Sequence, residues 1–228
     1  MDIRIVLVEP EHDINVGHCC RAMRNFGFRE LFIVNPKCPL GFEAHMYSKH
    51  GADVLKNARR VRSVEEALKG CALVVGTTGV ARRSKHVIRN PMSVAELKQK
   101  ARMVKGKMAL LLGREGMGLT PEEIKKCDFL VTIEADGSYP VLNLSHALAI
   151  LLYELRGAKG GTWEGLAPRA ERKALVDAFA RLARKGGKKV RVRDPAKIAT
   201  AFKNVVERAL VSSIEARAIL AALKEEKE

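Results

Sequence analysis

The chain has 228 residues, of which 47% are hydrophobic and 29% are charged, a balance typical of a soluble globular protein with its own core. No apolar run approaches the roughly 20 residues of a membrane-spanning helix, and the first residues lack a signal-peptide pattern, so we expect neither a membrane span nor a signal peptide. The net charge of +15 favours a polyanionic partner, and nucleic acid is the first candidate.

The number and spacing of the cysteines indicate the cellular compartment and argue against a metal site. The five cysteines form no C-x-x-C pair and no zinc spacing. Their odd number fits a reducing cytoplasm, in which most of the thiols fill small apolar spaces. The sequence therefore predicts a cytoplasmic protein without a metal ion.

From the N-terminus to about residue 156, short apolar runs alternate with helical stretches. The runs are rich in Val, Ile or Leu without polar alternation, which is typical of strands covered on both faces. This alternation predicts an α/β fold with a mostly parallel sheet and helices on both faces. The predicted strands are 3–9, 31–35, 72–77, 108–113 and 129–134, and the predicted helices lie near 15–26, 48–59, 63–69, 93–101, 121–127 and 143–156.

The composition changes after Arg156. Residues 157–168 are rich in glycine and are interpreted as a linker, and beyond them the apolar residues recur at helical spacing without any evident strand. We therefore predict three parts: a domain at 1–157, a linker at 158–168 and a small all-helical extension at 169–228. A capping box at Ser212–Glu215 predicts the start of the last helix.

The extension is strongly basic, with 17 Lys and Arg against 9 Asp and Glu in residues 158–228. Within it, "RLARKGGKKVRVR" (181–193) has seven basic residues and no acidic one. A solvated face is the plain interpretation of such a run, but the Gly-Gly break favours an exposed loop that contacts the phosphates of RNA or DNA. The predicted RNA-binding residues are Arg184, Lys185, Lys188, Lys189, Arg191 and Arg193.

Three glycine-containing loops follow predicted strands. In "NVGHCCRAMRNFGF" (15–28), Asn15 and Gly17 open a helix, and Arg21 alone could be an ordinary surface residue. In "VVGTTGVARR" (74–83), a strand ends in Gly-Thr-Thr-Gly at the edge where open α/β sheets bind ligands. The third, "LLGREGMGLTPEE" (111–123), matches neither a dinucleotide-binding fingerprint nor a P-loop, and we interpret it as a ligand-touching loop.

Taken together, these loops resemble a known family. The order N-x-G-x-x-x-R-A-x-x-x-x-G, then L-x-G-R-E-x-x-G-L-T, then L-N-L before an apolar helix, is similar to the SPOUT class of RNA methyltransferases. Within that class the chain most resembles the TrmJ-type tRNA ribose 2′-O-methyltransferases. The resemblance extends through "GADVLKNA" and "EEALKGCALVVGT" into "RDPAKIATAFKNVVERA", so it covers nearly the whole chain.

The resemblance implies a parallel sheet with a C-terminal trefoil knot, and a bound S-adenosyl-L-methionine held by the three loops. The turn before the last helix of the domain would contribute walls and backbone groups for the adenine, and Asn143 would fix that turn to its helix. The residues implied in cofactor binding are Thr77, Thr78, Gly79, Gly113, Glu115, Ile133, Pro140, Val141, Leu142 and Asn143.

The resemblance also implies the reaction, in which a ribose 2′-hydroxyl attacks the sulfonium methyl group. It points to Arg21 as the catalytic residue, with Asn15 beside it. Because a guanidinium with a pKa above about 12 rarely gives up a proton, Arg21 fits stabilisation of the developing alkoxide as well as the role of a general base. Val141 stands where the family commonly has serine, so no hydroxyl acts at that position.

The resemblance further implies a homodimer and a tRNA substrate, with methylation of cytidine at the first nucleotide of the anticodon loop. Two alternatives stay open at this stage. A non-catalytic RNA-binding protein would account for the charge alone, and a 2′-O-methyltransferase of another RNA, such as ribosomal RNA, would share the same loops.

Overall fold

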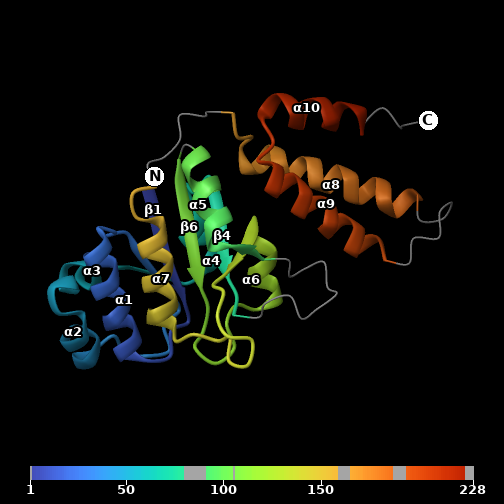
Figure 1. Cartoon of the computed structure of the whole chain (residues 1–228). Coiled ribbons are helices and arrows are strands. Elements are labelled where there is room, and N and C mark those ends of the chain that lie inside the picture. The colour runs from blue at the N-terminus through green and yellow to red at the C-terminus, as the bar shows by residue number, and fades with distance from the viewer. Residues whose placement is uncertain (1, 80–90, 105, 159–164, 187–193, 224–228) are drawn as a thin grey trace. The chain divides into compact units, whose positions relative to one another are not determined.

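The computed structural model of the chain (Figure 1) describes residues 2–79, 91–104, 106–158, 165–186 and 194–223. The chain divides into two compact units, the first within Met1–Arg83 and Pro91–Thr162 and the second over Trp163–Glu228. Within the described ranges, no helix is both long enough and apolar enough to cross a membrane.

The first unit is built on a parallel sheet. In the described residues its strand order is β3-β2-β1-β6-β4-β7-β5, and every neighbouring pair runs parallel. The α/β class with a parallel sheet is therefore confirmed. The strands are β1 (Asp2–Val8), β2 (Leu31–Val34), β3 (Arg59–Val61), β4 (Leu73–Thr77), β5 (Met92–Ser93), β6 (Lys107–Leu112) and β7 (Phe129–Thr132).

The central strands are the apolar runs that the sequence predicts. The side chains of β1 beyond Asp2 and all those of β2 are buried, because helices cover the sheet on both faces. The edge strands β3 and β5 were not predicted. Arg59 and Arg60 leave β3 largely exposed, and β5 has only two residues, so neither carries an apolar run that would indicate a strand.

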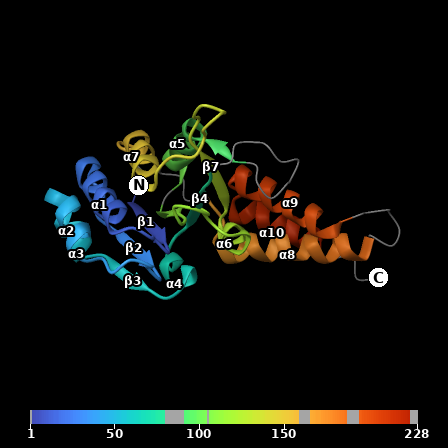
Figure 2. The same cartoon turned by 90° about the horizontal axis from the view of Figure 1, so that it is seen from below.

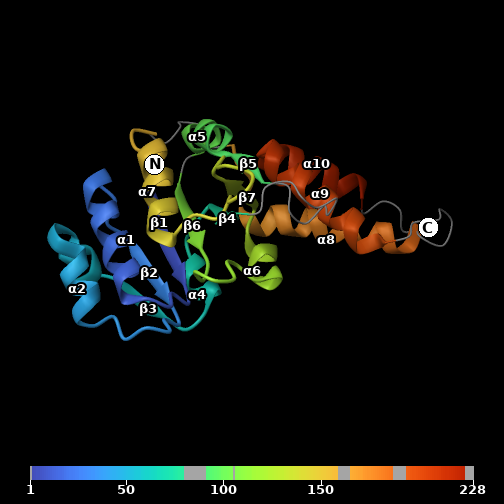
Figure 3. The same cartoon turned by 60° about the horizontal axis from the view of Figure 1, so that its bottom comes forward.

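Two groups of helices sandwich the sheet, as Figures 2 and 3 show. Helices α4 and α6 pack with one face of β1, β2, β4, β6 and β7 into a common apolar core. Helices α1, α5 and α7 lie on the other face, where α7 packs against both α1 and α5. These helices are α1 (Asp13–Phe26), α4 (Val64–Leu68), α5 (Val94–Met103), α6 (Pro121–Lys126) and α7 (Leu144–Leu155).

The predicted single helix at 48–59 is wrong. The structure has α2 (Phe42–Ser48), the 3-10 turn η1 (Lys49–Gly51) and α3 (Ala52–Lys56) in this region. The chain bends at Lys49, whose φ of 49° no α-helix allows. By contrast, the predicted start of α6 is confirmed: Thr120 and Glu123 form a capping box with Pro121 in the first turn.

The second unit contains helices α8 (Arg169–Gly186), α9 (Pro195–Ala209) and α10 (Ser213–Ala222). Leu175, Val206 and Val211 lie in its small apolar core, beside which the rings of Phe179 and Phe202 stack with centroids 3.9 Å apart. The core also encloses an ion pair between Arg172 and Glu207. The capping box predicted at the start of the last helix is confirmed at Ser212 and Glu215.

Candidate functional site

A relay of hydrogen bonds joins segments that are far apart in the sequence. The Glu115 carboxylate, in the loop after β6, accepts a bond of 2.9 Å from the backbone N–H of Glu11 and one of 3.0 Å from the amide of Asn15. The Asn15 side-chain oxygen in turn accepts a bond of 3.0 Å from the amide of Asn143. The start of α1, the loop after β6 and the turn before α7 are therefore tied together.

Asn143 ends the relay by capping α7. Its side-chain oxygen accepts bonds of 2.9 Å from the backbone N–H of Ser145 and 2.8 Å from the Ser145 hydroxyl. An N-cap of this kind satisfies the free N–H groups at the start of a helix. Asn143 therefore fixes the end of the irregular turn both to α7 and to the relay.

The loop after β4 reaches the same turn. A Cβ placed on Gly79 would lie 3.3 Å from Cγ2 of Val141 and 3.6 Å from the carbonyl oxygen of Pro140. The backbone N–H of Thr78 donates a bond of 3.0 Å to the carbonyl of Val131 at the end of β7. We call the set Gly79, Glu115, Asn15 and Pro140–Asn143 the junction.

The loop after β6 is a tight hairpin whose first residue has to be glycine. Arg114 and Gly118 exchange backbone hydrogen bonds of 3.2 Å and 2.9 Å. A Cβ on Gly113 would overlap the backbone of Gly118 and Leu119, and Gly118 itself has a φ of 67°. The two glycines therefore fold the hairpin back on itself and present Glu115 at its tip.

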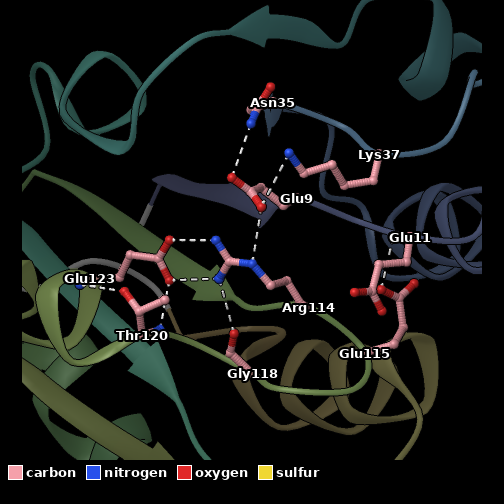
Figure 4. Close-up of polar contacts among 9 residues, drawn as sticks. All are labelled: Glu9, Glu11, Asn35, Lys37, Arg114, Glu115, Gly118, Thr120 and Glu123. Atoms are coloured by element: carbon pink, nitrogen blue, oxygen red, sulfur yellow. Dashed lines mark hydrogen bonds and ion pairs between the residues drawn. The ribbon is translucent and has the colours of Figure 1, made fainter.

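Arg114 anchors this hairpin (Figure 4). Its guanidinium donates two bonds of 3.0 Å to the Glu123 carboxylate, at the start of α6, and one of 3.1 Å to the carboxylate of Glu9, after β1. Asn35 and Lys37, after β2, contact Glu9 from the other side at 3.0 Å and 3.5 Å. One arginine thus ties together the ends of β1 and β6 and the start of α6.

Hydrogen bonds in this network outweigh the cost of burying its charged groups. The bonds that the Arg114 guanidinium donates to Glu123 and Glu9 outweigh burial and raise the pKa of Arg114. Burial opposes the charged form of Glu123, but bonds from Arg114 and Thr120 outweigh it and lower the pKa of that carboxyl. The hairpin is therefore held by groups that stay charged at neutral pH.

The residues predicted to bind the cofactor all follow strands or lie in the turn before α7. Thr77 ends β4 and Thr78 follows it, Gly113 begins the hairpin, Ile133 follows β7, and Leu142 precedes Asn143 in the turn. Because the strands are parallel, their carboxyl ends meet at one edge of the sheet. The structure thus brings the three loops to a single edge.

Arg21 lies apart from the junction of its own chain. It is exposed on α1, roughly 9 Å along the helix axis from Asn15 and about 120° around it by helical geometry. Of the predicted RNA-binding residues, Arg184 is exposed near the end of α8, and Lys185 follows it in that helix. Lys188, Lys189, Arg191 and Arg193 lie outside the described residues.

Sequence reasoning missed Arg114 and its partners Glu9 and Glu123. A signal was present, since Arg114 lies between two glycines in a hairpin that turn chemistry alone does not require. No pattern in the sequence indicated that Glu9, 105 residues away, would be one of its partners. In the part of the chain that the structure describes, no group of three or more His, Cys, Asp or Glu side chains could hold a metal ion.

Comparison with known proteins identifies the family of this chain. The SpoU rRNA Methylase family matches residues 2–153, and the chain belongs to that family. It is accordingly an S-adenosylmethionine-dependent RNA ribose 2′-O-methyltransferase by family.

Several of the proteins that this chain resembles carry the TrmJ name. The tRNA (cytidine-2′-O-)-methyltransferase TrmJ of Methanocaldococcus jannaschii is 35% identical over 97% of this chain and 98% of that protein. The tRNA (cytidine/uridine-2′-O-)-methyltransferase TrmJ of Escherichia coli K12 is 40% identical over 72% of this chain and 66% of that protein. The crystal structure of TrmJ from Z. mobilis ZM4 superposes with a TM-score of 0.71 and 26% identity, covering 99% of each chain.

The residues at the sheet edge fit a molecule such as S-adenosylmethionine. The Thr132 hydroxyl, at the end of β7, is buried and has no hydrogen-bond partner among the described residues. The loop after β4 lies against the turn at Gly79, where an added Cβ would come within 3.3 Å of Cγ2 of Val141. A hydroxyl without a hydrogen-bond partner is a group that can bind the polar edge of an adenine.

Proposed function

We propose that the protein is a tRNA ribose 2′-O-methyltransferase that acts on cytidine at the first nucleotide of the anticodon loop. The single observation that carries the proposal is the junction, in which three loops meet at the carboxyl edge of the sheet. The names of the relatives support the substrate, because the Methanocaldococcus jannaschii protein that matches nearly the whole chain is named as a tRNA cytidine methyltransferase.

In this proposal the junction and its neighbours hold the cofactor. Thr77–Gly79, Gly113, Ile133 and Pro140–Leu142 line the site, and the bound group supplies an electrophilic methyl for the ribose oxygen. Glu115 and Asn143 complete the site and also hold its loops together, because both oxygens of Glu115 and the amide of Asn143 take part in the relay. Holding the loops in one geometry lowers the entropy lost when the ligand binds.

Arg21 is the proposed catalytic residue. A permanently charged guanidinium stabilises the alkoxide that develops at the ribose 2′-oxygen and binds the adjoining phosphate. Val141 is half exposed and lacks a hydroxyl, so it takes no part in removing the proton. Asn15 is committed to Glu115 and Asn143, which suits a residue that fixes the start of α1 and thereby the helix that carries Arg21.

The position of Arg21 supports a homodimer. Since Arg21 lies about a third of a turn around α1 from the side of Asn15, it points away from the junction of its own chain. A second copy whose cofactor site lies beside Arg21 would complete the catalytic site from two chains. The proposed catalytic site is thus composite, with the cofactor on one chain and Arg21 on the other.

We also propose a trefoil knot and a role for the second unit. After β7, which lies beyond β4, the chain returns to pack α7 on α1 and passes Gly79 on the way. This path, with the turn before α7 in contact with Gly79, supports the knot. The extension at 169–228, linked through 158–168, would grip the tRNA through Arg184, Lys185 and the basic residues that follow them.

The test uses the full-length protein with S-adenosylmethionine carrying a labelled methyl group, and unmodified tRNA. Mapping the labelled ribose should place it at the first nucleotide of the anticodon loop on cytidine, and Arg21→Ala should abolish transfer while leaving the affinity for S-adenosylhomocysteine nearly unchanged. Absence of transfer to tRNA, with transfer to ribosomal RNA instead, would refute the proposed substrate. Absence of any binding of S-adenosylhomocysteine would favour a non-catalytic RNA-binding protein.

A further inference from the structure

The outward face of α1 forms a stripe beside a second segment of the chain. Ile14, His18, Arg21 and Asn25 recur at spacings of three and four residues, and all of them are at least partly exposed, whereas most of the residues between them are buried. This stripe carries the catalytic arginine. Residues that flank this stripe can therefore contact the same RNA as Arg21.

Residues 44–51 run along this stripe. A Cβ on Gly17 would lie 2.7 Å from the carbonyl oxygen of Ala44, and the rings of His18 and Tyr47 are 5.0 Å apart. One turn further along α1, a Cβ on Gly51 would lie 2.9 Å from the backbone nitrogen of Arg21. The end of α2 and η1 are thus in backbone contact with α1 at the level of the catalytic arginine.

Lys49 and His50, which immediately precede Gly51, are both exposed. Among the described residues, neither Lys49 nor Arg21 forms an ion pair with a carboxylate. The nearest acidic residue along the chain, Asp53, is engaged instead by Arg29 at 2.7 Å and by Arg24 at 3.9 Å. The surface beside Arg21 therefore keeps its positive charge.

Lys49 occupies a backbone conformation that ordinarily requires glycine. Its φ of 49° with a ψ of −124° lies outside the regions allowed to residues with a side chain. Such strain is retained where the surrounding structure enforces it and clusters at functional sites. Glycine would fit this backbone at lower cost, so the presence of lysine indicates that its side chain is needed.

We propose that Lys49 and His50 form, together with Arg21, a phosphate-binding surface that holds the RNA backbone next to the reacting ribose. The Lys49 ammonium contributes charge and the His50 imidazole a hydrogen-bond donor. Lys49 and His50 are positioning residues in this scheme, since they hold the substrate and take no part in methyl transfer. This inference rests on the proposed function and adds to it the residues that hold the RNA backbone.

Three variants of the full-length protein test this surface: Lys49→Gly, Lys49→Ala and the matched control Lys69→Ala, which removes an exposed lysine after α4. The affinity for unmodified tRNA is measured by filter binding between 50 and 200 mM salt, without cofactor. Both Lys49 variants should weaken binding roughly tenfold at the lower salt and reduce the salt slope by about one, whereas Lys69→Ala should do neither.

A second pair of measurements separates contact with RNA from loss of structure. Lys49→Gly should raise the melting temperature by roughly 2–4 °C because it relieves the strained φ, while raising the KM for tRNA and leaving kcat nearly unchanged. His50→Gln, which keeps a donor, should retain more affinity than His50→Ala. A variant that is more stable and yet binds RNA less well is an outcome that a purely structural role of Lys49 does not produce.

The results distinguish the two proposals. If the wild-type enzyme methylates tRNA and Lys49→Gly binds it with the affinity and salt slope of the Lys69→Ala control, the phosphate-binding surface is wrong and the proposed function stands. If the wild-type enzyme binds S-adenosylhomocysteine but transfers no methyl group to tRNA, the proposed function fails, and this surface, which rests on it, fails with it.

Discussion

Replacing Glu115 with glutamine tests whether the relay holds the cofactor site together. The two carboxylate oxygens accept bonds from two N–H donors, the backbone of Glu11 at 2.9 Å and the amide of Asn15 at 3.0 Å. Glutamine has nearly the same shape but only one oxygen, and its NH₂ group would face one of these donors. The substitution therefore changes hydrogen bonding at the hairpin tip with little change in packing.

The magnitude follows from the kind of bond that is lost. Hydrogen bonds to a charged group contribute about 1.5–3 kcal/mol when buried, and the bond to Glu11 lies at an exposed position where solvent weakens it. The substitution is therefore expected to weaken the hydrogen bonds of the relay by about 1–2 kcal/mol in total. If the loops must be joined before ligand binds, this loss corresponds to an affinity for S-adenosylhomocysteine that is roughly 5- to 30-fold weaker.

Isothermal titration calorimetry with S-adenosylhomocysteine measures this affinity, and a thermal melt verifies that the variant is folded. Glu122→Gln is the matched control, because Glu122 is an exposed residue of α6 and should leave the affinity unchanged. Combining Glu115→Gln with Asn143→Ala should cost less than the sum of the single effects, since both break one relay. An affinity of Glu115→Gln within twofold of the wild type would refute the role of the relay.

The remaining predictions concern the hairpin and the second unit. Gly113→Ala should abolish cofactor binding in calorimetry while the chain stays folded by circular dichroism, because its Cβ would overlap the facing backbone of the hairpin. Glu207→Ala should destabilise the second unit by about 3–5 kcal/mol in urea unfolding, since it leaves Arg172 charged and buried. The folded-state pKa of Glu123 lies below its ordinary value of 4.5, so its contribution is full above that pH and is lost as the pH falls through the lowered value. Urea midpoints of wild type and Glu123→Gln should therefore converge below pH 4.5, and a constant difference would contradict the ion pair with Arg114.

The central sheet was predictable because burial on both faces leaves a clear pattern. Most of β1 and β6 is apolar, apart from Asp2, Arg4 and Lys107, and an apolar run of this length between turn residues is typical of a buried strand. The bend at Lys49 was not predictable in the same way. Gly51 is a weak helix former, but a glycine alone does not say where a helix bends, and the break depends on the tertiary contact between Gly51 and α1.

The loops of the candidate site could be found from their glycines, but their connections could not. Glycine motifs mark places where the backbone turns tightly, and parallel strands bring such places to one edge. Which side chains then meet depends on the register of the sheet and on the path of α7. The bond between Asn15 and Asn143 joins residues 128 apart, and the bond between Arg114 and Glu9 joins residues 105 apart. No pattern in the sequence near either residue of these pairs predicts the contact.

The two charged residues at the start of the hairpin explain how so glycine-rich a loop can be rigid. Arg114 is bound to Glu9 and Glu123, whereas Glu115 is bound to Glu11 and Asn15. Adjacent residues are thus held by different partners, and the backbone between them has little freedom left. Glycine supplies the tight turn but would by itself add conformational entropy. Because these ionic and amide contacts form within the protein chain itself, the loop is ordered before any ligand arrives, and binding energy need not be spent on ordering it.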